Sequence, residues 1–221
     1  MPHKALSNTG QMANESIAKG DITGWFEELY VQSAGDPSVI PWGDQKPNPY
    51  LVQWLEKNSI EGKGRSALVI GCGLGDDAEE LSGHGFNVTA FDIAPTAIEW
   101  AKKRFNGSGV EYFVADLFDL PKQWIGAFDF VFECYTIQAL PRSVRSDVIG
   151  KVASVVASGG ELLIVCRGWR DGQTEDNLPW ALKKQELEQF KQLGFSEMLF
   201  EEFWDQDDPD RYRFRILYKK A

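Results

Sequence analysis

The stretch Ala67-Leu-Val-Ile-Gly-Cys-Gly-Leu-Gly-Asp-Asp77 decides the fold that we predict for this chain. Its apolar start, Ala67 to Ile70, is typical of a buried strand. A glycine turn follows, which we define as Gly71, Gly73 and Gly75, and Asp76 to Leu81 then shows the polar and apolar pattern of a helix. A strand, a glycine-rich turn and a helix N-terminus form the adenosine-binding corner of nucleotide-type α/β folds.

Two aspartates lie at the ends of the next predicted strands. Asp92 closes the strand Asn87–Ile93, 17 residues after Gly75. In nucleotide-binding α/β folds, an acid about 20 residues after the glycine turn holds the ribose hydroxyls. Asp116 follows the strand Val110–Ala115. These matching positions favour a ligand site over a glycine turn that binds nothing.

The charges beside the turn favour S-adenosylmethionine (SAM) over NAD(P) as the adenosine ligand. Gly73-Leu-Gly75-Asp-Asp-Ala78 also fits the dinucleotide fingerprint GxGxxA. A pyrophosphate binds at the positive end of a helix, where Asp76 and Asp77 would repel it. SAM carries no phosphate, and its sulfonium and ammonium groups tolerate carboxylates. We therefore expect SAM as cofactor, with S-adenosylhomocysteine as its product.

Composition and charge restrict the possible partners. The 221 residues suit one domain with a full core, and the formal net charge of −10 disfavours nucleic acid and anionic membrane surfaces as partners. The three cysteines show neither a CxxC pair nor zinc-ligand spacing, so we predict no metal and a reducing compartment. The N-terminus lacks a long apolar run, so we predict a soluble cytoplasmic protein that acts on a small molecule.

Strand and helix patterns alternate from Ser66 onward, which predicts a parallel sheet with helices on both faces. The predicted strands are Ser66–Gly71, Asn87–Ile93, Val110–Ala115, Phe128–Cys134, Glu161–Cys166, Phe195–Trp204 and Tyr212–Tyr218. The predicted helices are Asp76–Gly83, Pro95–Phe105, Arg142–Val156, ended by Gly159-Gly160, and Lys183–Leu193. The fold class is therefore α/β, a Rossmann-like doubly wound seven-stranded sheet, mostly parallel with a C-terminal antiparallel hairpin.

The N-terminal region is expected to form a tail and a helical cap on a single domain. Residues 1–20 are expected to form a flexible tail, and residues 21–221 a single domain. Within residues 21–57, Asp21–Ser33 has helical periodicity, and Tyr50–Lys57 has it again after a proline-rich segment. The first of these helices is either packed on the core or a lid over a cofactor.

Three stretches carry a resemblance to a known family. Trp25, Pro41-Trp42-Gly-Asp44 and Asn48-Pro-Tyr-Leu51 form a tryptophan-rich segment, and Val69 stands two residues before the first glycine. The third stretch is Phe128-Asp-Phe-Val-Phe-Glu133. The chain thus resembles the class I SAM-dependent methyltransferases over roughly residues 21–219, and within them the thiopurine methyltransferase branch, which includes thiol and halide methyltransferases.

The resemblance implies a cofactor site at the carboxyl ends of the first strands. The glycine turn would pass under the methionine and ribose parts of SAM. Asp92 would accept hydrogen bonds from the ribose hydroxyls, with Ile93 beside the adenine. Asp116 would accept from the adenine amino group, with Leu117 against the ring.

The resemblance also implies residues near the reacting methyl group. Glu133 would bind the ammonium group of SAM or act as a base, and Tyr135 would face the methyl group. Trp25 and Trp42 would cover the cofactor, because aromatic faces attract cations, although plain core packing explains both equally well. The implied substrate-binding residues are Trp42, Tyr135, Arg167 and Trp169.

The stretch Phe132-Glu-Cys-Tyr135 limits the acceptor. It lacks the Asn/Asp-Pro-Pro-aromatic motif that resembling enzymes use to hold a planar amide or amine. A thiolate or halide needs little help from a base, so we expect methyl transfer to a small molecule, with a thiol or other soft nucleophile favoured. Two alternatives stay open: an NAD(P)-dependent oxidoreductase, and a non-catalytic SAM-binding or protein-interaction domain.

Overall fold

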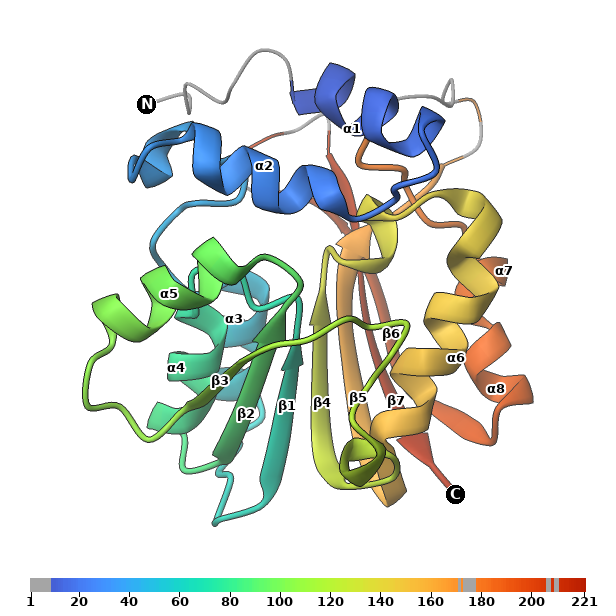
Figure 1. The fold of residues 1–221 in the computed structure, drawn as a ribbon. Coiled ribbons are helices and arrows are strands. Elements are labelled where there is room, and N and C mark those ends of the chain that lie inside the picture. The colour runs from blue at the N-terminus through green and yellow to red at the C-terminus, as the bar shows by residue number, and fades with distance from the viewer. Residues whose placement is uncertain (1–8, 171, 173–177, 206–207, 209–210) are drawn as a thin grey trace. The chain divides into compact units, whose positions relative to one another are not determined.

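The computed structural model contains one mixed sheet and describes residues 9–170, 172, 178–205, 208 and 211–221. The strand order is β3-β2-β1-β4-β5-β7-β6 (Figure 1). The strands are β1 Ser66–Ile70, β2 Asn87–Asp92, β3 Glu111–Val114, β4 Phe128–Cys134, β5 Val156–Arg167, β6 Phe195–Trp204 and β7 Tyr212–Lys220. Strand β7 runs antiparallel to both β5 and β6, and the other described pairs are parallel. The predicted α/β class, with its C-terminal hairpin, is confirmed.

The helices follow the predicted order, and the chain separates into two compact units. The α-helices are α1 Thr9–Ala18, α2 Gly24–Gln32, α3 Pro49–Lys57, α4 Asp76–Gly83, α5 Pro95–Arg104, α6 Arg145–Val155, α7 Lys184–Leu187 and α8 Gln189–Gln192. The first unit comprises residues 1–64 and 71–116, and the second comprises residues 65–70 and 117–221.

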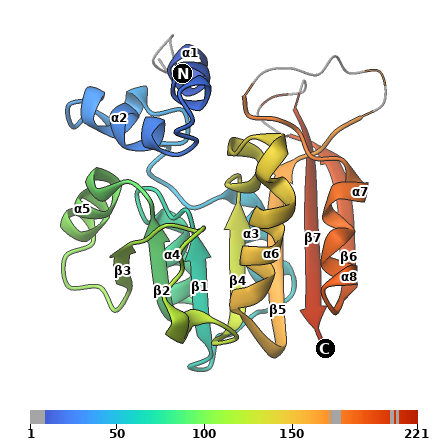
Figure 2. The same ribbon diagram turned by 45° about the vertical axis from the view of Figure 1, so that its right-hand side comes forward.

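The first unit is built around the parallel pair β2 and β3, in which Ala90 lies opposite Tyr112. Helices α4 and α5 pack on β2, α2 packs on α5, and α1 packs on α2 (Figure 2). Helix α3 begins where Asn48 accepts a hydrogen bond from the Tyr50 amide and Pro49 fills the first turn, so the end of the proline-rich segment is also a helix start.

The second unit holds three of the predicted substrate-binding residues, Tyr135, Arg167 and Trp169, at or just after the ends of β4 and β5. Ile70 of β1 pairs with Glu133 of β4, and β4 pairs in parallel with β5. Helix α6 packs on β4 and on α8, which in turn packs on β6 (Figure 2). The core of the second unit includes the buried side chains of Phe130, Phe132, Leu163, Ile164, Val165 and Ile216. Because β4 and β5 are parallel, Glu133 and Arg167 lie at the same carboxyl edge of this unit's sheet.

Three local predictions differ from the structure in the second unit. The helix predicted over Arg142–Val156 is a 3₁₀ turn, Arg142–Val144, followed by α6. The glycines that we expected to end it lie inside β5, where a Cβ on Gly160 would stand 2.9 Å from the Phe128 carbonyl oxygen. The helix predicted over Lys183–Leu193 is split into α7 and α8. Close approach of two strands, rather than helix termination, explains Gly160.

The predicted N-terminal tail contains a helix. Residues Thr9–Ala18 form α1, which buries Met12 and Ala13 and has a side-chain hydrogen bond from Gln11 to Glu15 of 2.7 Å. The sequence shows only a weak helical period here, so packing on α2 decides the helix. Residues 1–8 lie outside the described part of the chain.

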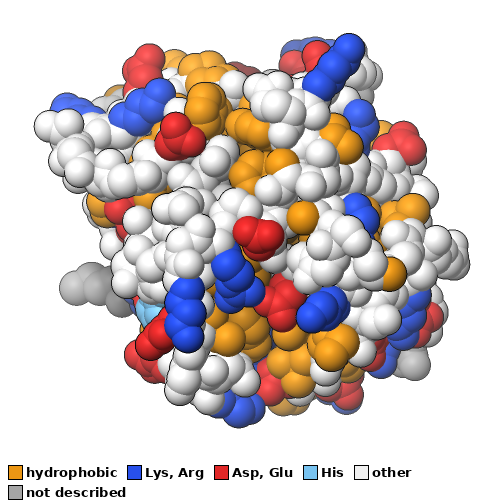
Figure 3. All heavy atoms as spheres, turned by 90° about the horizontal axis from the view of Figure 1, so that it is seen from below, with side chains coloured by type: hydrophobic (Ala, Val, Ile, Leu, Met, Phe, Trp, Pro, Cys, Tyr) orange, Lys and Arg blue, Asp and Glu red, His pale blue; other side chains and the backbone are white. Residues whose placement is uncertain are grey.

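The surface and helix lengths bear on possible partners. On the face that Figure 3 shows, lysine and arginine side chains are interspersed with aspartate and glutamate, without a patch of one sign. Within the described ranges, every helix is too short or too polar to cross a membrane.

Arg145 joins α6 to the segment before α7. Its side chain is 3% exposed, donates to Glu186 Oε1 at 2.6 Å and donates to the Trp180 carbonyl oxygen at 2.9 Å. Burying a charge is favourable only when such partners replace its lost hydration. The arginine therefore fixes this segment through a buried charge rather than through apolar packing.

We expect Arg145→Met to lower the free energy of unfolding by about 2 kcal/mol, because hydrogen bonds to a buried charged group are lost. The matched control is Arg65→Met, whose partner is Glu161 at 3.1 Å and whose side chain is 37% exposed. That exposed pair should contribute less than about 1 kcal/mol. Urea unfolding measures both, and equal losses would contradict the assignment of Arg145.

Candidate active site

The glycine turn adopts a backbone that other residues rarely reach. The φ angles are +61° at Gly71, +51° at Gly73 and +91° at Gly75, all in the left-handed region. A Cβ on Gly75 would lie 2.6 Å from the hydroxyl oxygen of Tyr112, which is too close for any side chain. The turn thus requires glycine for two reasons: its left-handed backbone, and the lack of room for a Cβ at Gly75.

Asp92 ties the end of β2 to the glycine turn. Its carboxylate accepts a hydrogen bond from the Gly73 amide at 2.9 Å and another from the Ala94 amide at 2.9 Å. Burial raises the pKa of Asp92, and the backbone amides of Ala94, Gly73 and Ile93 act in the opposite direction. Each carboxylate oxygen keeps a second lone pair, so the side chain can still accept from a ligand hydroxyl.

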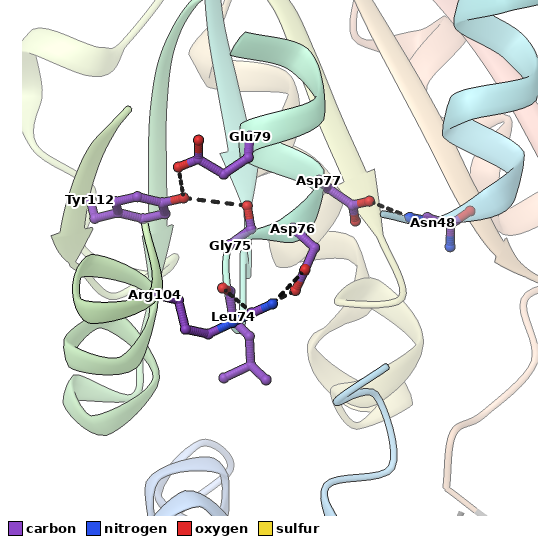
Figure 4. Close-up of polar contacts among 8 residues, drawn as sticks. All are labelled: Asn48, Leu74, Gly75, Asp76, Asp77, Glu79, Arg104 and Tyr112. Carbon is purple, nitrogen blue, oxygen red and sulfur yellow. Dashed lines mark hydrogen bonds and ion pairs between the residues drawn. The ribbon is translucent and has the colours of Figure 1, made fainter. Parts of the chain in front are cut away.

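The acids at the start of α4 are held by other residues (Figure 4). Asp76 forms two hydrogen bonds of 2.8 Å with Arg104, which also donates to the Leu74 carbonyl oxygen at 2.8 Å. Asp77 accepts from the Asn48 amide at 2.6 Å, and burial raises the pKa of Asp77 to about 7. Because Arg104 neutralises Asp76, these acids repel a pyrophosphate less strongly than the sequence suggested.

Tyr112 explains why the turn and β3 meet so closely. Its hydroxyl donates to Glu79 Oε1 at 2.7 Å and lies 3.3 Å from the Gly75 carbonyl oxygen (Figure 4). Burial, with Glu79 as the next cause, raises the pKa of Tyr112. Tyr112 and Arg104 were not among the predicted site residues, because only the fold brings β3 and α5 to the turn.

An aromatic cluster from α2 and the proline-rich segment lies against the turn. Trp25 is fully buried and stacks on Phe26 at 3.9 Å between ring centroids. Trp42 is half-buried, meets Trp25 edge-on at 6.1 Å and donates to the Tyr30 hydroxyl at 2.7 Å. A Cβ on Gly73 would lie 3.2 Å from that hydroxyl. The structure thus brings Trp42, and the unpredicted Tyr30, to the glycine turn, and gives Trp25 a packing position.

Helix α2 is fixed to α5 by Glu27. One carboxylate oxygen accepts from the Thr96 amide at 3.0 Å and the other from the Thr96 hydroxyl at 2.7 Å. The amide is one of the free N–H groups at the start of α5, so Glu27 caps that helix from another element. The predicted cap helix is therefore anchored, and no sequence signal pointed to Glu27.

Ile93 and Asp116 occupy neighbouring strand ends in the same unit. Ile93 directly follows β2, Asp116 comes two residues after β3, and both are half-buried. The Ala115 amide donates to the Asp92 carbonyl oxygen at 3.1 Å, which holds the two strand ends together. This is the placement that the sequence predicted for residues beside an adenosine. Leu117, the next predicted residue, is buried and belongs to the second unit.

Glu133 lies near the end of β4 with a partly satisfied carboxylate. One oxygen accepts from the Thr136 amide at 2.7 Å and the Ile137 amide at 3.0 Å. The other oxygen, Oε2, is buried and has no hydrogen-bond partner among the described residues. Burial raises the pKa of Glu133 to about 7. An unpartnered buried oxygen of this kind is suited to a cation or a proton.

Tyr135 follows in a strained conformation. Its φ of +63° is unusual for a residue with a side chain, and its amide donates to the Val165 carbonyl oxygen at 3.2 Å. The guanidinium carbon of Arg213 lies 4.7 Å from the ring centroid. Strain at the end of a sheet strand is common where a side chain is positioned for function.

Arg167 and Trp169 lie in the segment that begins at the end of β5. The Arg167 amide donates to the side chain of Gln138, and its carbonyl oxygen accepts from the Leu182 amide at 2.8 Å. The Trp169 amide donates to the Leu182 carbonyl oxygen at 2.8 Å. Gln138, buried and unpredicted, thus fixes the backbone of a predicted substrate residue.

Comparison with known proteins gives similarity over most of the chain. A family model described as "Thiopurine S-methyltransferase (TPMT)" matches residues 35–215. "Probable thiol methyltransferase 2" from Arabidopsis thaliana is 26% identical over 165 residues, which are 72% of this chain and 68% of that protein. "Ubiquinone biosynthesis O-methyltransferase" from Xanthomonas axonopodis pv. citri is 31% identical over 128 residues, but these are 55% of this chain and 52% of that protein.

Among solved structures, the chain is similar to the 1,6-didemethyltoxoflavin-N1-methyltransferase of Burkholderia thailandensis. The TM-score is 0.69, with 18% identity, over 95% of this chain and 90% of that chain. At this identity the likeness concerns the fold. It agrees with the sheet order and the C-terminal hairpin described above.

We expect Gly75→Ala to lower stability and to weaken binding of S-adenosylhomocysteine. The left-handed backbone alone should cost about 1–2 kcal/mol. The control Gly107→Ala has the same φ class, +90°, but open space around its Cβ. It should lose only that amount, whereas Gly75→Ala also meets Tyr112. Adding Tyr112→Phe should restore part of the difference. Urea unfolding and calorimetric titration test this, and equal losses in the two alanine variants would contradict it.

We expect the stability of the chain to fall as the pH rises from about 5 to about 8, partly because of Glu133. Its pKa of about 7 in the folded chain lies above the ordinary 4.5, so the folded state binds more protons in this range. The stability is fully present below the ordinary pKa and is lost as the pH rises through 7.

Glu133→Gln should remove a share of this pH dependence on the order of 3 kcal/mol. Asp77→Asn should remove a separate share, because burial raises its pKa in the same way. Urea midpoints measured across the pH range test both variants. An unchanged slope in Glu133→Gln would show that this carboxylate is not buried as described.

Proposed function

The chain belongs to the thiopurine S-methyltransferase family, and we propose that it transfers a methyl group from SAM to the sulfur of a small thiol. The family match over residues 35–215 carries this proposal. The similarity to a protein described as a probable thiol methyltransferase supports it. The stretch Phe132-Glu-Cys-Tyr135 agrees with it, because it lacks the motif for holding a planar amide or amine.

Family membership confirms the broader predictions. The chain is a SAM-dependent methyltransferase of the class I, Rossmann-like type, with SAM as its cofactor. The methyl acceptor is a small molecule. The NAD(P)-dependent oxidoreductase alternative is therefore set aside on the family match, since the charge argument against it is weakened by Arg104.

The first unit offers groups that fit SAM. The glycines of the turn carry no Cβ that could block a ligand, although Tyr30 and Trp42 border Gly73 and Tyr112 borders Gly75. The Asp92 carboxylate can accept further hydrogen bonds. Half-buried Trp42 presents an aromatic ring beside Gly73, where a sulfonium cation would be attracted. The cofactor-binding residues that we propose in this unit are Trp25, Trp42, Gly71, Gly73, Gly75, Asp92, Ile93 and Asp116.

The second unit offers a negative charge and an aromatic ring. We propose that Glu133 pairs through Oε2 with the ammonium group of SAM, because that oxygen has no other described partner. Its alternative role is that of a base, for which a pKa of about 7 is suitable. Tyr135 would border the reacting methyl group, and Leu117 would pack on the adenine. Trp42, Tyr135, Arg167 and Trp169 would contact the acceptor.

Methyl transfer needs little from the protein beyond alignment of the acceptor with the methyl group. When bound, SAM supplies a methyl group on a sulfonium sulfur that leaves as a neutral thioether. The chain has to hold the acceptor thiolate in line with that methyl group and exclude water. A thiol ionises far more readily than an alcohol, with a pKa of about 8.5 for a free cysteine, so it needs less help from a base.

Matched aromatic acceptors separate sulfur from oxygen as the methylated atom. Incubated with SAM, the purified chain should form the methyl thioether of thiophenol and at least tenfold less of the methyl ether of phenol. The softer and more acidic thiol is the better nucleophile here. Mass spectrometry of both products, with S-adenosylhomocysteine as a common measure of turnover, gives the ratio.

The control variant is Asp92→Asn, which keeps the shape of the side chain but loses its charge. It should weaken the binding of S-adenosylhomocysteine about tenfold, as expected for a lost hydrogen bond to a charged group. If the chain preferred phenol, the proposed methylated atom would be oxygen rather than sulfur. An oxygen acceptor is the second candidate because of the 31% identical O-methyltransferase. Tight cofactor binding without transfer to any acceptor would support the non-catalytic alternative.

We also propose a cytoplasmic location and a single methyltransferase domain over residues 21–221. The acidic charge and the small, odd number of cysteines support the location. Cooperative unfolding in urea as one transition would support the single domain, and two separate transitions would favour the two compact units as independent domains.

A further inference from the structure

We propose that Arg167 binds a carboxylate on the methyl acceptor, at a subsite that it forms with Arg213 and Tyr135. The inference rests on the proposed function, because it names the class of thiol: one that carries an anionic group. All three residues belong to the second unit and lie at the carboxyl edge of its parallel strands.

The first observation is a like-charge pair across two strands. Arg167, the last residue of β5, lies directly opposite Arg213 of β7. Directly opposite side chains of an antiparallel pair project from the same face of the sheet, and like charges there destabilise it. Two arginines in these positions therefore require negative charge nearby.

The second observation concerns the negative charges already present. Asp205 forms an almost fully buried ion pair with Arg213, and its carboxylate accepts hydrogen bonds from Nε at 2.9 Å and from Nη2 at 2.8 Å. Asp208 forms an ion pair with Arg211, with 2.8 Å between Oδ2 and Nε. Each of these acids is thus hydrogen-bonded to an arginine other than Arg167, although Asp208 also acts electrostatically on Arg167. Neither is in hydrogen-bond contact with Arg167.

Arg167 differs from its neighbours. Its backbone is fixed by Gln138 and Leu182, and its side chain is half-buried. Within the described part of the chain, the guanidinium has no hydrogen bond and no ion pair. Burial lowers the pKa of Arg167, and the charges of Arg211 and Arg213 act in the same direction, whereas the charge of Asp208 acts in the opposite direction. A partly dehydrated guanidinium among two others is a favourable place for an anion.

The surroundings favour a carboxylate on an aromatic or similarly flat acceptor. A guanidinium binds a carboxylate through two parallel hydrogen bonds. The ring of Tyr135 lies 4.7 Å from the Arg213 guanidinium carbon, and Tyr135 bonds through its amide to β5, next to Arg167. Since the whole chain carries a net charge of −10, an anionic acceptor needs such a local positive site.

The test compares two thiols of matched shape, 4-mercaptobenzoate and 4-methylbenzenethiol, with SAM as donor at about pH 8, where both are largely thiolates. The wild-type chain should show a kcat/KM at least tenfold higher for the carboxylate, mainly through a lower KM. A charge-assisted hydrogen-bond pair is of this size. A ratio near one would overturn the inference while leaving the proposed function intact.

Three variants locate the effect. Arg167→Gln should bring the ratio of the two kcat/KM values close to one, and Arg167→Lys should keep part of it, because an ammonium group keeps the charge but not the two-pronged geometry. Arg65→Gln, the same change at the residue before β1, should leave the ratio as in the wild type. If Arg167 had only a structural role, Arg167→Gln would lower both values alike and leave the ratio unchanged, which would overturn the inference.

A binding measurement separates this inference from the proposed function. If neither thiol is methylated, the proposed thiol activity fails, and 4-methylbenzoate then serves as an inert probe of the subsite. Calorimetric titration should give at least tenfold weaker binding to Arg167→Gln than to the wild type. Equal binding, or no binding to either, would overturn the carboxylate subsite.

Discussion

The hydrogen bond from the Gly73 amide to the Asp92 carboxylate is the constraint on which the first unit depends. It joins the glycine turn to the end of β2, and a backbone bond from Cys72 to Phe91 reinforces it. Burying a carboxylate is unfavourable unless amides satisfy it, so the turn must bring its N–H groups to Asp92. That requires left-handed backbone at the glycines, whose missing Cβ atoms remove one obstacle to a nucleoside-containing cofactor.

The aromatic cluster gives helix α2 features of both predicted roles, a helix packed on the core and a cover for the cofactor. Trp25 is fully buried, and Glu27 holds α2 on the first turn of α5, which is the behaviour of a core helix. Tyr30 and Trp42, however, turn toward Gly73 and are linked by a hydrogen bond. One face of α2 thus stabilises the unit while another borders the proposed cofactor site, so packing and function share a helix.

In the second unit, several buried charged groups have partners of opposite charge or backbone amides. Arg145 pairs with Glu186, Arg213 pairs with Asp205, and one oxygen of Glu133 takes two backbone amides. Glu133 Oε2 has no hydrogen-bond partner among the described residues. The Arg167 guanidinium has no hydrogen bond or ion pair in the same part of the chain. One is suited to a cation and the other to an anion, and a methyl donor with an ammonium group and an anionic thiol have those charges.

The sequence by itself determined the strand order along the chain, the left-handed glycines and the acids at two strand ends, because period and turn chemistry are local. The same local signals misplaced Gly159-Gly160 and missed α1, since strand approach and helix packing depend on partners far along the chain. Only the tertiary structure decided that Arg104 neutralises Asp76, that Glu27 caps α5 and that Arg167 stands opposite Arg213. Each of these contacts joins residues from different elements, and a pattern read along one segment carries no information about the element that will lie against it.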